Sequence, residues 1–156
     1  MPENLPTAAR YVFVYGTLRR GGLNDITRLQ PAPRFVAQAS LPGVMYHLGH
    51  YPGVLLGGSG VVCGEIYEIS VEVERQLDVI EEVWPQPTGE YAKREVLVQA
   101  GPVRDPAGHL PLIPFVFPAG ARLSCIVYEL NPDRVLGTAR VSSGDWFKST
   151  TADGAC

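Results

Sequence analysis

The stretch Tyr11-Val-Phe-Val-Tyr-Gly-Thr-Leu-Arg-Arg-Gly-Gly22 decides how the rest of the chain is interpreted. Its first five residues are aromatic or β-branched, and the run is too short and too apolar for a surface helix, so it predicts a buried strand. Gly16 follows directly and allows the backbone to turn where a Cβ would forbid it. Such a turn can direct the amides of Gly16, Thr17 and Leu18 toward one point, which is an arrangement that holds an anion.

Polar side chains follow this turn and leave two interpretations open. Thr17 would add a hydroxyl to an anion site, and Arg19 and Arg20 would add positive potential close by. The alternative is an ordinary junction between a strand and a loop, with two solvated arginines. Taken alone, the stretch favours the ordinary junction.

The bulk properties limit the class of protein. The chain has 156 residues, which suffices for one domain with a substantial core. Its net charge of −3 argues against a nucleic-acid partner. No apolar run approaches the roughly 20 residues that cross a bilayer, and the first residues lack the pattern of a signal peptide. We expect one cytoplasmic domain over residues 1–156, with a core at about 10–130 and a weakly patterned tail.

Neither the cysteines nor the histidines indicate a metal site. Cys63 and Cys125 lie in apolar, strand-like runs, Cys156 is the last residue, and their spacing is not of a metal-binding type. Buried free thiols are the expectation in a reducing cytoplasm. The three histidines form no ligand set either: His47, His50 and His109.

Several further strands are predicted, separated by turns. They cover residues 34–41, 44–48, 54–56, 61–69, 91–99 and 122–130. Pro42-Gly43 and Tyr51-Pro52-Gly53 are typical of turns, and residues 57–60 are expected to form a loop. Gly64 indicates a bulge or a close contact. Residues 23–30 fit a short helix or an irregular loop, and residues 100–114 an excursion rich in proline and glycine.

One helix is clear. Ser70 is a favourable N-cap, and an apolar stripe follows at helical spacing, formed by Val73, Leu77, Ile80 and Trp84. Pro85 and Pro87 are expected to end the helix. About six strands and one helix indicate a small α+β domain, with a closed or nearly closed barrel and the helix against one side.

The apolar stripe also predicts which carboxylates of the helix lie nearest to its buried face. With a rotation of 100° per residue, Glu81 lies about 70° from the centre of the stripe, at the border of the buried face. Glu74 and Asp78 lie further out, and Glu82 lies nearly opposite. Partial burial would raise the pKa of Glu81 and suit it to act as a general base. The alternative is an edge residue that pairs with Arg94 or a similar cation.

Five short motifs occur in order along most of the chain, over roughly residues 11–130. They are Tyr15-Gly16-Thr17-Leu18, Tyr51-Pro52-Gly53, Gly64-Glu65-Ile66-Tyr67, Leu77-Asp78-Val79-Ile80-Glu81, and Tyr91 with Arg94. Together they strongly resemble the gamma-glutamylcyclotransferase-like proteins, including the gamma-glutamylamine cyclotransferase branch. The resemblance implies a mixed β-barrel flanked by helices, with a cavity at its mouth.

The resemblance also implies the site residues. The loop that wraps the gamma-glutamyl group would be Tyr15, Gly16, Thr17 and Leu18, and the catalytic acid would be Glu81. Tyr91 and Tyr128 would line the pocket, although both could be ordinary strand aromatics. The expected partner is a small gamma-glutamyl substrate, with no metal or other cofactor. The reaction would be intramolecular aminolysis that gives 5-oxoproline and a free amine or amino acid.

Two departures from the family pattern leave questions open. The segment 82–90 is longer than expected and could reshape the leaving-group side of the pocket, and the doubled Glu81-Glu82 leaves the register open by one residue. Glu65 has no assigned role. A non-catalytic module that binds a small anion is the alternative function, and a hydrolase that uses Glu81 to activate water is a weaker one.

Overall fold

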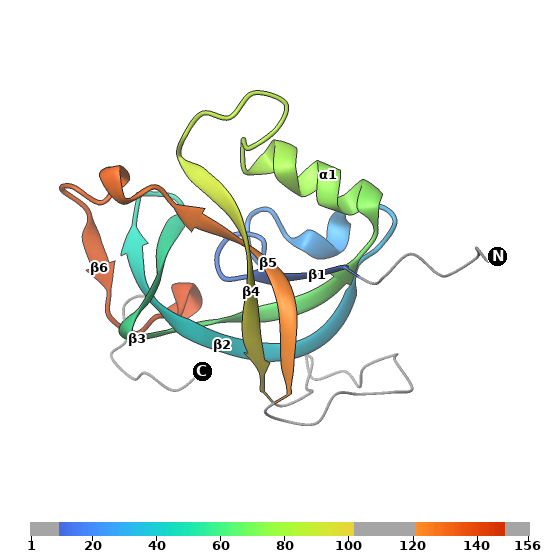
Figure 1. Ribbon diagram of the computed structural model, residues 1–156, viewed down its shortest axis with the longest axis horizontal. Coiled ribbons are helices and arrows are strands. Elements are labelled where there is room, and N and C mark those ends of the chain that lie inside the picture. The colour runs from blue at the N-terminus through green and yellow to red at the C-terminus, as the bar shows by residue number, and fades with distance from the viewer. Residues whose placement is uncertain (1–9, 102–120, 149–156) are drawn as a thin grey trace.

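Six strands and one α-helix make up the protein in the computed structural model, which describes residues 10–101 and 121–148 (Figure 1). The helix is α1 (Val71–Ile80), and three short 3-10 turns accompany it. The strands are β1 (Arg10–Val14), β2 (Arg34–His47), β3 (Pro52–Ile69), β4 (Tyr91–Ala100), β5 (Arg122–Leu130) and β6 (Ala139–Val141).

Five of the strands close into a barrel. Their order is β3-β1-β5-β4-β2, and β2 pairs with β3 to complete the ring. β1 and β5 are parallel, whereas the other pairs are antiparallel, so the barrel is mixed. β6 adds to the outer end of β2 through residues 45–47. The predicted fold class, a small mixed β-barrel with α+β character, is confirmed.

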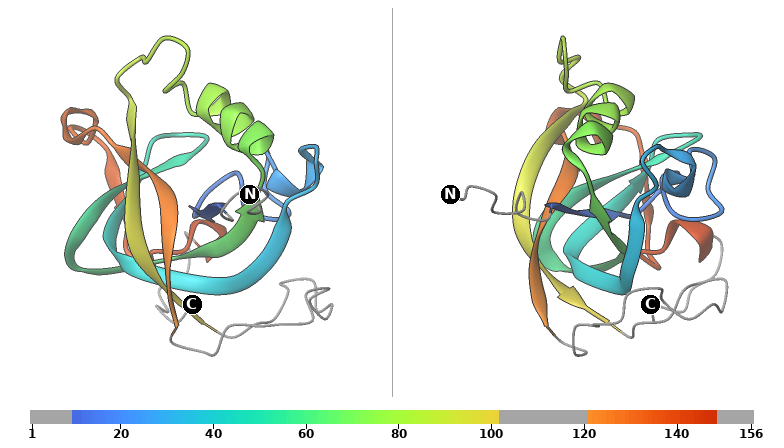
Figure 2. Two further views of the ribbon diagram at one scale, coloured as in Figure 1. Left: turned by 45° about the vertical axis from the view of Figure 1, so that its right-hand side comes forward. Right: turned by 90° about the vertical axis from the view of Figure 1, so that its right-hand side faces the viewer.

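β1 is buried on both of its faces. Phe13 and Tyr15 belong to the cluster that fills the barrel. Val12 and Val14 belong to a second cluster, which includes Leu77 of α1. The helix therefore lies on the outside of the barrel, next to the chain that leaves β1 (Figure 2). Burial on both faces explains why residues 12–14 are all apolar instead of alternating with polar residues.

β2 and β3 are longer than the sequence predicts. Pro42-Gly43 does not turn the chain, because β2 runs through it from Arg34 to His47. Residues 57–60 do not separate two strands either. They form an irregularity within β3, since Pro42 pairs with Val61 while Gly43 already pairs with Leu56. Gly57 and Gly58 adopt φ values of 89° and 88° there, which glycine tolerates without a steric penalty.

Helix α1 begins where the sequence predicts. Ser70 is the N-cap, and its hydroxyl accepts a hydrogen bond from the amide of Val73 at 3.1 Å. The helix ends at Ile80, so the predicted extension to Trp84 is wrong. Trp84 is 43% exposed, and its ring lies 4.2 Å from the guanidinium of Arg75 instead of in the core.

The buried side of α1 is rotated toward its acidic residues. Asp78 is buried and Glu74 is half-buried, whereas Ile80 is exposed. Glu81 is half-buried, as predicted, but the ranking that puts Asp78 further from the buried face than Glu81 is wrong, because Asp78 is the more buried of the two. The ranking counts Ile80 and Trp84 in the apolar stripe, whereas Ile80 is exposed and Trp84 lies beyond the end of the helix.

The cysteines do not all conform to the expectation of free thiols. Cys125 is a buried free thiol, as predicted, and burial raises its pKa to about 12. Cys63 is disulfide-bonded, so the expectation is wrong for this residue. Separation along the sequence does not reveal which side chains approach one another in space. Cys156, His109 and most of the predicted excursion at 100–114 lie outside the described residues.

Candidate active site

A pocket of about 240 Å³ opens between the end of β1, the start of β4 and the C-terminal end of α1. All seven residues that the sequence singles out line this pocket: Tyr15, Gly16, Thr17, Leu18, Glu81, Tyr91 and Tyr128. They come from four separate parts of the chain. The structure thus brings the predicted loop, acid and tyrosines together in one place.

The loop after β1 is held by its carbonyl groups. The carbonyl of Gly16 accepts from the amide of Arg19 at 3.0 Å, that of Thr17 from the amide of Asn24 at 2.9 Å, and that of Leu18 from the amide of Ile26 at 2.9 Å. Within the described residues, none of the turn and loop hydrogen bonds uses the amides of residues 16–18 as donors. These amides are therefore available to a ligand in the pocket.

Gly16 is required for a different reason from the one the sequence suggests. Its φ is not in the left-handed region, so the backbone conformation itself does not demand glycine. A Cβ at this position would lie 2.6 Å from Cγ of Pro52. The close approach of Pro52 to the loop therefore excludes a side chain at residue 16.

Glu81 follows the last residue of α1 and lines the pocket. It is half-buried, and burial raises the pKa of its carboxyl to about 7, with a further contribution from the negative charges of Glu90 and Glu82. The alternative partner, Arg94, pairs with Glu129 at 3.0 Å instead. No ion pair of Glu81 occurs within the described part of the chain.

The tyrosines of the pocket are fixed through their hydroxyls. Tyr15 donates to the carbonyl of Tyr128 at 2.7 Å, and Tyr91 donates to the carbonyl of Pro52 at 2.8 Å. Burial is the main cause that raises the pKa of each of the three tyrosines above its ordinary value. They therefore remain protonated, and the hydrogen bonds of their hydroxyls fix the side chains that form the wall of the pocket.

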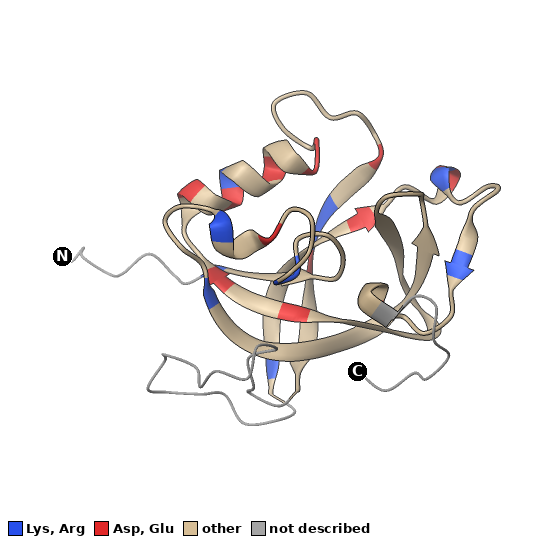
Figure 3. Cartoon of the chain, turned by 180° about the vertical axis from the view of Figure 1, so that it is seen from behind, with Lys and Arg blue, Asp and Glu red and all other residues tan. Residues whose placement is uncertain are grey.

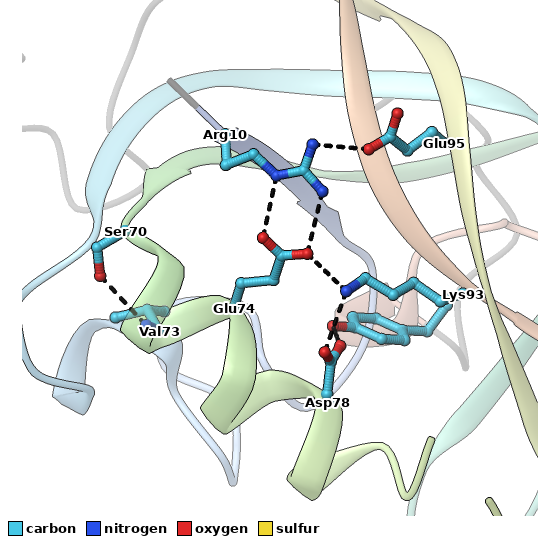
Figure 4. A network of polar contacts seen from close by, with 8 residues as sticks. Arg10, Ser70, Val73, Glu74, Asp78, Lys93 and Glu95 are labelled. Carbon is cyan, nitrogen blue, oxygen red and sulfur yellow. Dashed lines mark hydrogen bonds and ion pairs between the residues drawn. The ribbon is translucent and has the colours of Figure 1, made fainter. Parts of the chain in front are cut away.

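A charged network supports this wall from behind (Figure 4). Tyr128 donates its hydroxyl to Asp78 at 2.7 Å, and Lys93 pairs with the same carboxylate at 3.0 Å and with Glu74. Arg10 in turn forms two hydrogen bonds of 3.0 Å with Glu74. The network ties α1 to β1, β4 and β5, which explains how the helix can bury two carboxylates.

The expectation that both arginines of the loop are solvated is wrong for Arg19. Its side chain is buried and pairs with Glu65 at 3.1 Å and with Asp145 at 2.7 Å. Glu65, which is fully buried, also accepts from the amide of Arg20 at 3.0 Å and from the hydroxyl of Tyr67 at 2.9 Å. Arg19 therefore anchors the loop to the barrel and does not line the pocket.

Four further residues form the rim of the pocket: Glu82, Glu90, His50 and Tyr51. Sequence reasoning gave Glu82 only as the alternative acid and Tyr51 only as part of a turn motif, and it gave Glu90 and His50 no place in the site. Tyr51 donates its hydroxyl to Glu90 at 2.7 Å. A signal was present in the sequence, because the segment 82–90 departs in length from the family pattern and carries an acid at each end.

Neither a metal centre nor a membrane-spanning helix occurs among the described residues. No group of histidine, cysteine, aspartate or glutamate there has the arrangement of a metal centre. Among the same residues, none of the helices has both the length and the apolar character needed to span a bilayer.

Comparisons with known proteins agree with this fold. The model of the family "Gamma-glutamyl cyclotransferase, AIG2-like" matches residues 12–148, and the chain belongs to this family. The solution structure of ytfP from Escherichia coli covers 90% of this chain and 99% of its own, with a TM-score of 0.57 and 26% identity. An AIG2-like protein from Mus musculus covers 83% of this chain and 84% of its own, with a TM-score of 0.58 and 26% identity.

Curated relatives match over shorter segments. Gamma-L-glutamyl-butirosin B gamma-glutamyl cyclotransferase of Niallia circulans is 40% identical over 72 residues, which is 46% of this chain and 45% of the relative. The gamma-glutamylcyclotransferase family protein YtfP of Escherichia coli K12 is 33% identical over 93 residues, which is 58% of this chain and 74% of the relative. The chain thus spans about half the length of the first of these relatives.

Proposed function

We propose that the protein is a gamma-glutamyl cyclotransferase that closes a gamma-glutamyl amide into 5-oxoproline, with Glu81 as its general acid and base. One observation carries this proposal: a carboxyl whose pKa is raised to about 7 shares a pocket with the available amides of residues 16–18. A group that titrates near neutrality both accepts and returns a proton efficiently. Membership of the family supports the same reaction.

In this reaction the α-amine of the glutamyl group attacks its own gamma-carbonyl carbon. Glu81 removes a proton from the amine, a new C–N bond closes the five-membered ring, and a tetrahedral oxyanion forms. The bond to the leaving nitrogen then breaks as Glu81 returns the proton to that nitrogen. Nucleophile and electrophile belong to one molecule, so folding the substrate correctly contributes much of the catalysis, on the order of 7–11 kcal/mol.

The loop and the tyrosines have separate tasks in this scheme. The amides of Gly16, Thr17 and Leu18 bind the α-carboxylate of the substrate or the oxyanion of the intermediate. Loss of one donor of this kind raises a reaction barrier by about 2.7–4 kcal/mol. Tyr91 and Tyr128 orient the substrate against the pocket wall.

Substitution of the two adjacent acids tests the proposal. Glu81→Gln should abolish formation of 5-oxoproline from a panel of gamma-glutamyl amides, because an amide cannot transfer the proton, while Glu82→Gln should retain measurable turnover. Circular dichroism checks that both variants are folded. Activity that is lost in Glu82→Gln and kept in Glu81→Gln would assign the acid to residue 82.

The products of the same assay separate the alternatives. Release of glutamate instead of 5-oxoproline would indicate a hydrolase. If no amide in the panel is consumed but a gamma-glutamyl compound raises the thermal midpoint of the protein, the pocket belongs to a non-catalytic binding module.

A further inference from the structure

Glu65 of β3 is a buried carboxylate for which the proposed reaction has no task. Glu65 and Glu68 are the charged residues of this strand (Figure 3). Glu65 is 0% exposed, whereas Glu68 is half-buried. Glu65 pairs with Val14, the last residue of β1, and it does not line the pocket. This carboxylate therefore belongs to the point of β3 opposite which the loop after β1 begins.

The carboxylate of Glu65 holds this loop at two consecutive residues. Its Oε2 accepts from Nε of Arg19 at 3.1 Å, and its Oε1 accepts from the backbone amide of Arg20 at 3.0 Å. Oε1 also accepts from the hydroxyl of Tyr67 at 2.9 Å. Burial and the charge of Glu65 raise the pKa of Tyr67 above its ordinary value, so this hydroxyl remains a donor. Both carboxylate oxygens are thus engaged, which fixes the orientation of the group.

Arg19 links this carboxylate to the amides that the reaction uses. The amide of Arg19 donates to the carbonyl of Gly16 at 3.0 Å, so residues 16–19 form one turn, which contains the three residues whose amides are available to a ligand. The guanidinium of Arg19 also pairs with Asp145 at 2.7 Å and lies 4.3 Å from the ring of Phe147. A displacement of Arg19 therefore moves the turn that carries the amides.

A charged anchor gives this turn a constraint that apolar packing does not give. Burial of charges is costly, and apolar residues of similar volume often provide equal or greater stability. Hydrophobic contacts have no preferred direction, whereas hydrogen bonds between charged groups fix both distance and direction. Direction matters at this loop, because a misplacement of about 1 Å in a group that positions a substrate can cost about 100-fold in rate.

Resting on the proposed function, we infer that Glu65 is a positioning residue for this reaction: through Arg19 and the amide of Arg20, it holds the amides of residues 16–18 where they bind the anionic group of the substrate or of the intermediate. Glu65 does not line the pocket, so it acts on the reaction only through the loop.

The substitution Glu65→Gln tests this inference in the intact protein. It preserves the volume of the side chain, but the amide nitrogen that replaces one oxygen cannot accept from Arg19 or from the amide of Arg20. We expect kcat/KM for formation of 5-oxoproline, per folded molecule, to fall by about 10- to 100-fold. Circular dichroism gives the folded fraction. The matched control is Glu68→Gln, which removes an equal charge from the same strand outside the pocket and should preserve kcat/KM.

The binding of two lactams provides a measurement that a loss of folded protein does not change. 5-Oxoproline carries the α-carboxylate, and 2-pyrrolidinone has the same ring without it. Calorimetry gives the Kd of each lactam for the unmodified protein and for Glu65→Gln. If the loop amides bind the carboxylate, the variant should bind 5-oxoproline more weakly and 2-pyrrolidinone equally well. If they bind the oxyanion, kcat should fall while both Kd values stay the same. Either result supports the inference.

A second variant, Tyr67→Phe, serves if Glu65→Gln does not fold. It removes the hydroxyl that orients Oε1 of Glu65 and preserves both the buried ring and the charge of the carboxylate. We expect kcat/KM to fall in the same direction by about fivefold, because one hydrogen bond to the carboxylate is lost.

The outcomes separate this inference from the proposed function. A folded Glu65→Gln variant with unchanged kcat/KM and unchanged Kd values overturns the inference while the cyclotransferase activity stands. Equal weakening of both lactams also overturns it, because it indicates general damage to the pocket. Where Tyr67→Phe replaces the first variant, unchanged kcat/KM has the same meaning. If the unmodified protein converts no gamma-glutamyl amide, the proposed function fails and the inference fails with it.

Discussion

Two glutamates of one helical segment, Glu74 and Glu81, experience opposite environments. Arg10, with help from Lys93, lowers the pKa of Glu74 to about 2. Burial raises the pKa of Glu81 to about 7, where no cation of the described chain offsets it. The first carboxylate thus stabilises the fold when it is ionised, and the second destabilises it. A carboxyl that costs stability in its ionised form is frequent at functional sites, which is consistent with the role proposed for Glu81.

The first prediction concerns stability and pH at Glu81. Between about pH 4.5 and pH 7 the folded protein keeps the proton of Glu81 while the unfolded chain has lost it, so stability falls as pH rises through this window. Glu81→Gln removes this penalty. The variant should be more stable than the unmodified protein by about 2–3 kcal/mol at pH 8, after allowance for the partial exposure of the group, and equally stable near pH 4.

Urea unfolding from pH 4 to pH 8 measures this difference, and Glu74→Gln is the control of opposite sign. Because the folded pKa of Glu74 is depressed, its contribution is present above about pH 4.5 and is lost as pH falls toward 2. Glu74→Gln should therefore be less stable at pH 8. A Glu81→Gln variant that is no more stable than the unmodified protein at pH 8 would contradict the raised pKa.

At the scale of the element, the start of α1 is determined by nearby residues in the sequence, whereas its end is not. The start depends on Ser70 and the amide of Val73, three residues away, and could be predicted. The end could not, because Val83 and Trp84 direct their amides to the carbonyl of Asp78 and leave the helical path. The apolar spacing of Trp84 fits a continued helix equally well, so only the tertiary structure decides.

The second prediction concerns the helix start. Ser70→Ala removes the acceptor for the amide of Val73 and should lower the free energy of unfolding by about 1 kcal/mol. Ser70→Asp should retain most of the stability, because a carboxylate also caps the helix. Thermal or urea unfolding measures the change. Ser59→Ala, at an exposed position of β3, is the control and should have little effect. Equal stability of Ser70→Ala and Ser59→Ala would show that the cap contributes nothing.

β2 and β3 show why a turn-like composition leads to a wrong prediction here. Pro42-Gly43 and residues 57–60 have the composition of turns, but they lie opposite each other in one antiparallel pair. Pairing between β2 and β3 on both sides of this point keeps Pro42-Gly43 within a strand and leaves residues 57–60 as a local irregularity. Pairing between distant residues thus overrides local turn propensity, and no pattern within either segment reveals it.

At the scale of the whole molecule, short motifs were sufficient to predict which seven residues meet in the pocket, but not what surrounds them. The motif residues carry their own signals, since Tyr15 to Leu18 are contiguous and Glu81 closes the motif Leu77-Asp78-Val79-Ile80-Glu81. The rim acids and the anchor of Arg19 depend on contacts across the chain. Arg19 and Asp145 are separated by 126 residues, and the tail that carries Asp145 is weakly patterned.

The last prediction concerns this long-range anchor. Asp145 pairs with Arg19 at 2.7 Å, both side chains are buried, and the carboxylate also accepts from the amide of Phe147 at 3.0 Å. Asp145→Ala leaves part of the Arg19 charge unpaired in the interior and should lower the free energy of unfolding by about 3 kcal/mol. Urea unfolding at pH 7 measures the loss, which salt should alter little because the pair is buried.

Asp133→Ala is the control for this prediction. It removes an equal charge from an exposed position and should change stability by less than about 0.5 kcal/mol. If both variants lose the same small amount, the pair with Asp145 does not anchor the loop, and the remaining contacts of Arg19, with Glu65 and with the ring of Phe147, must hold it in place.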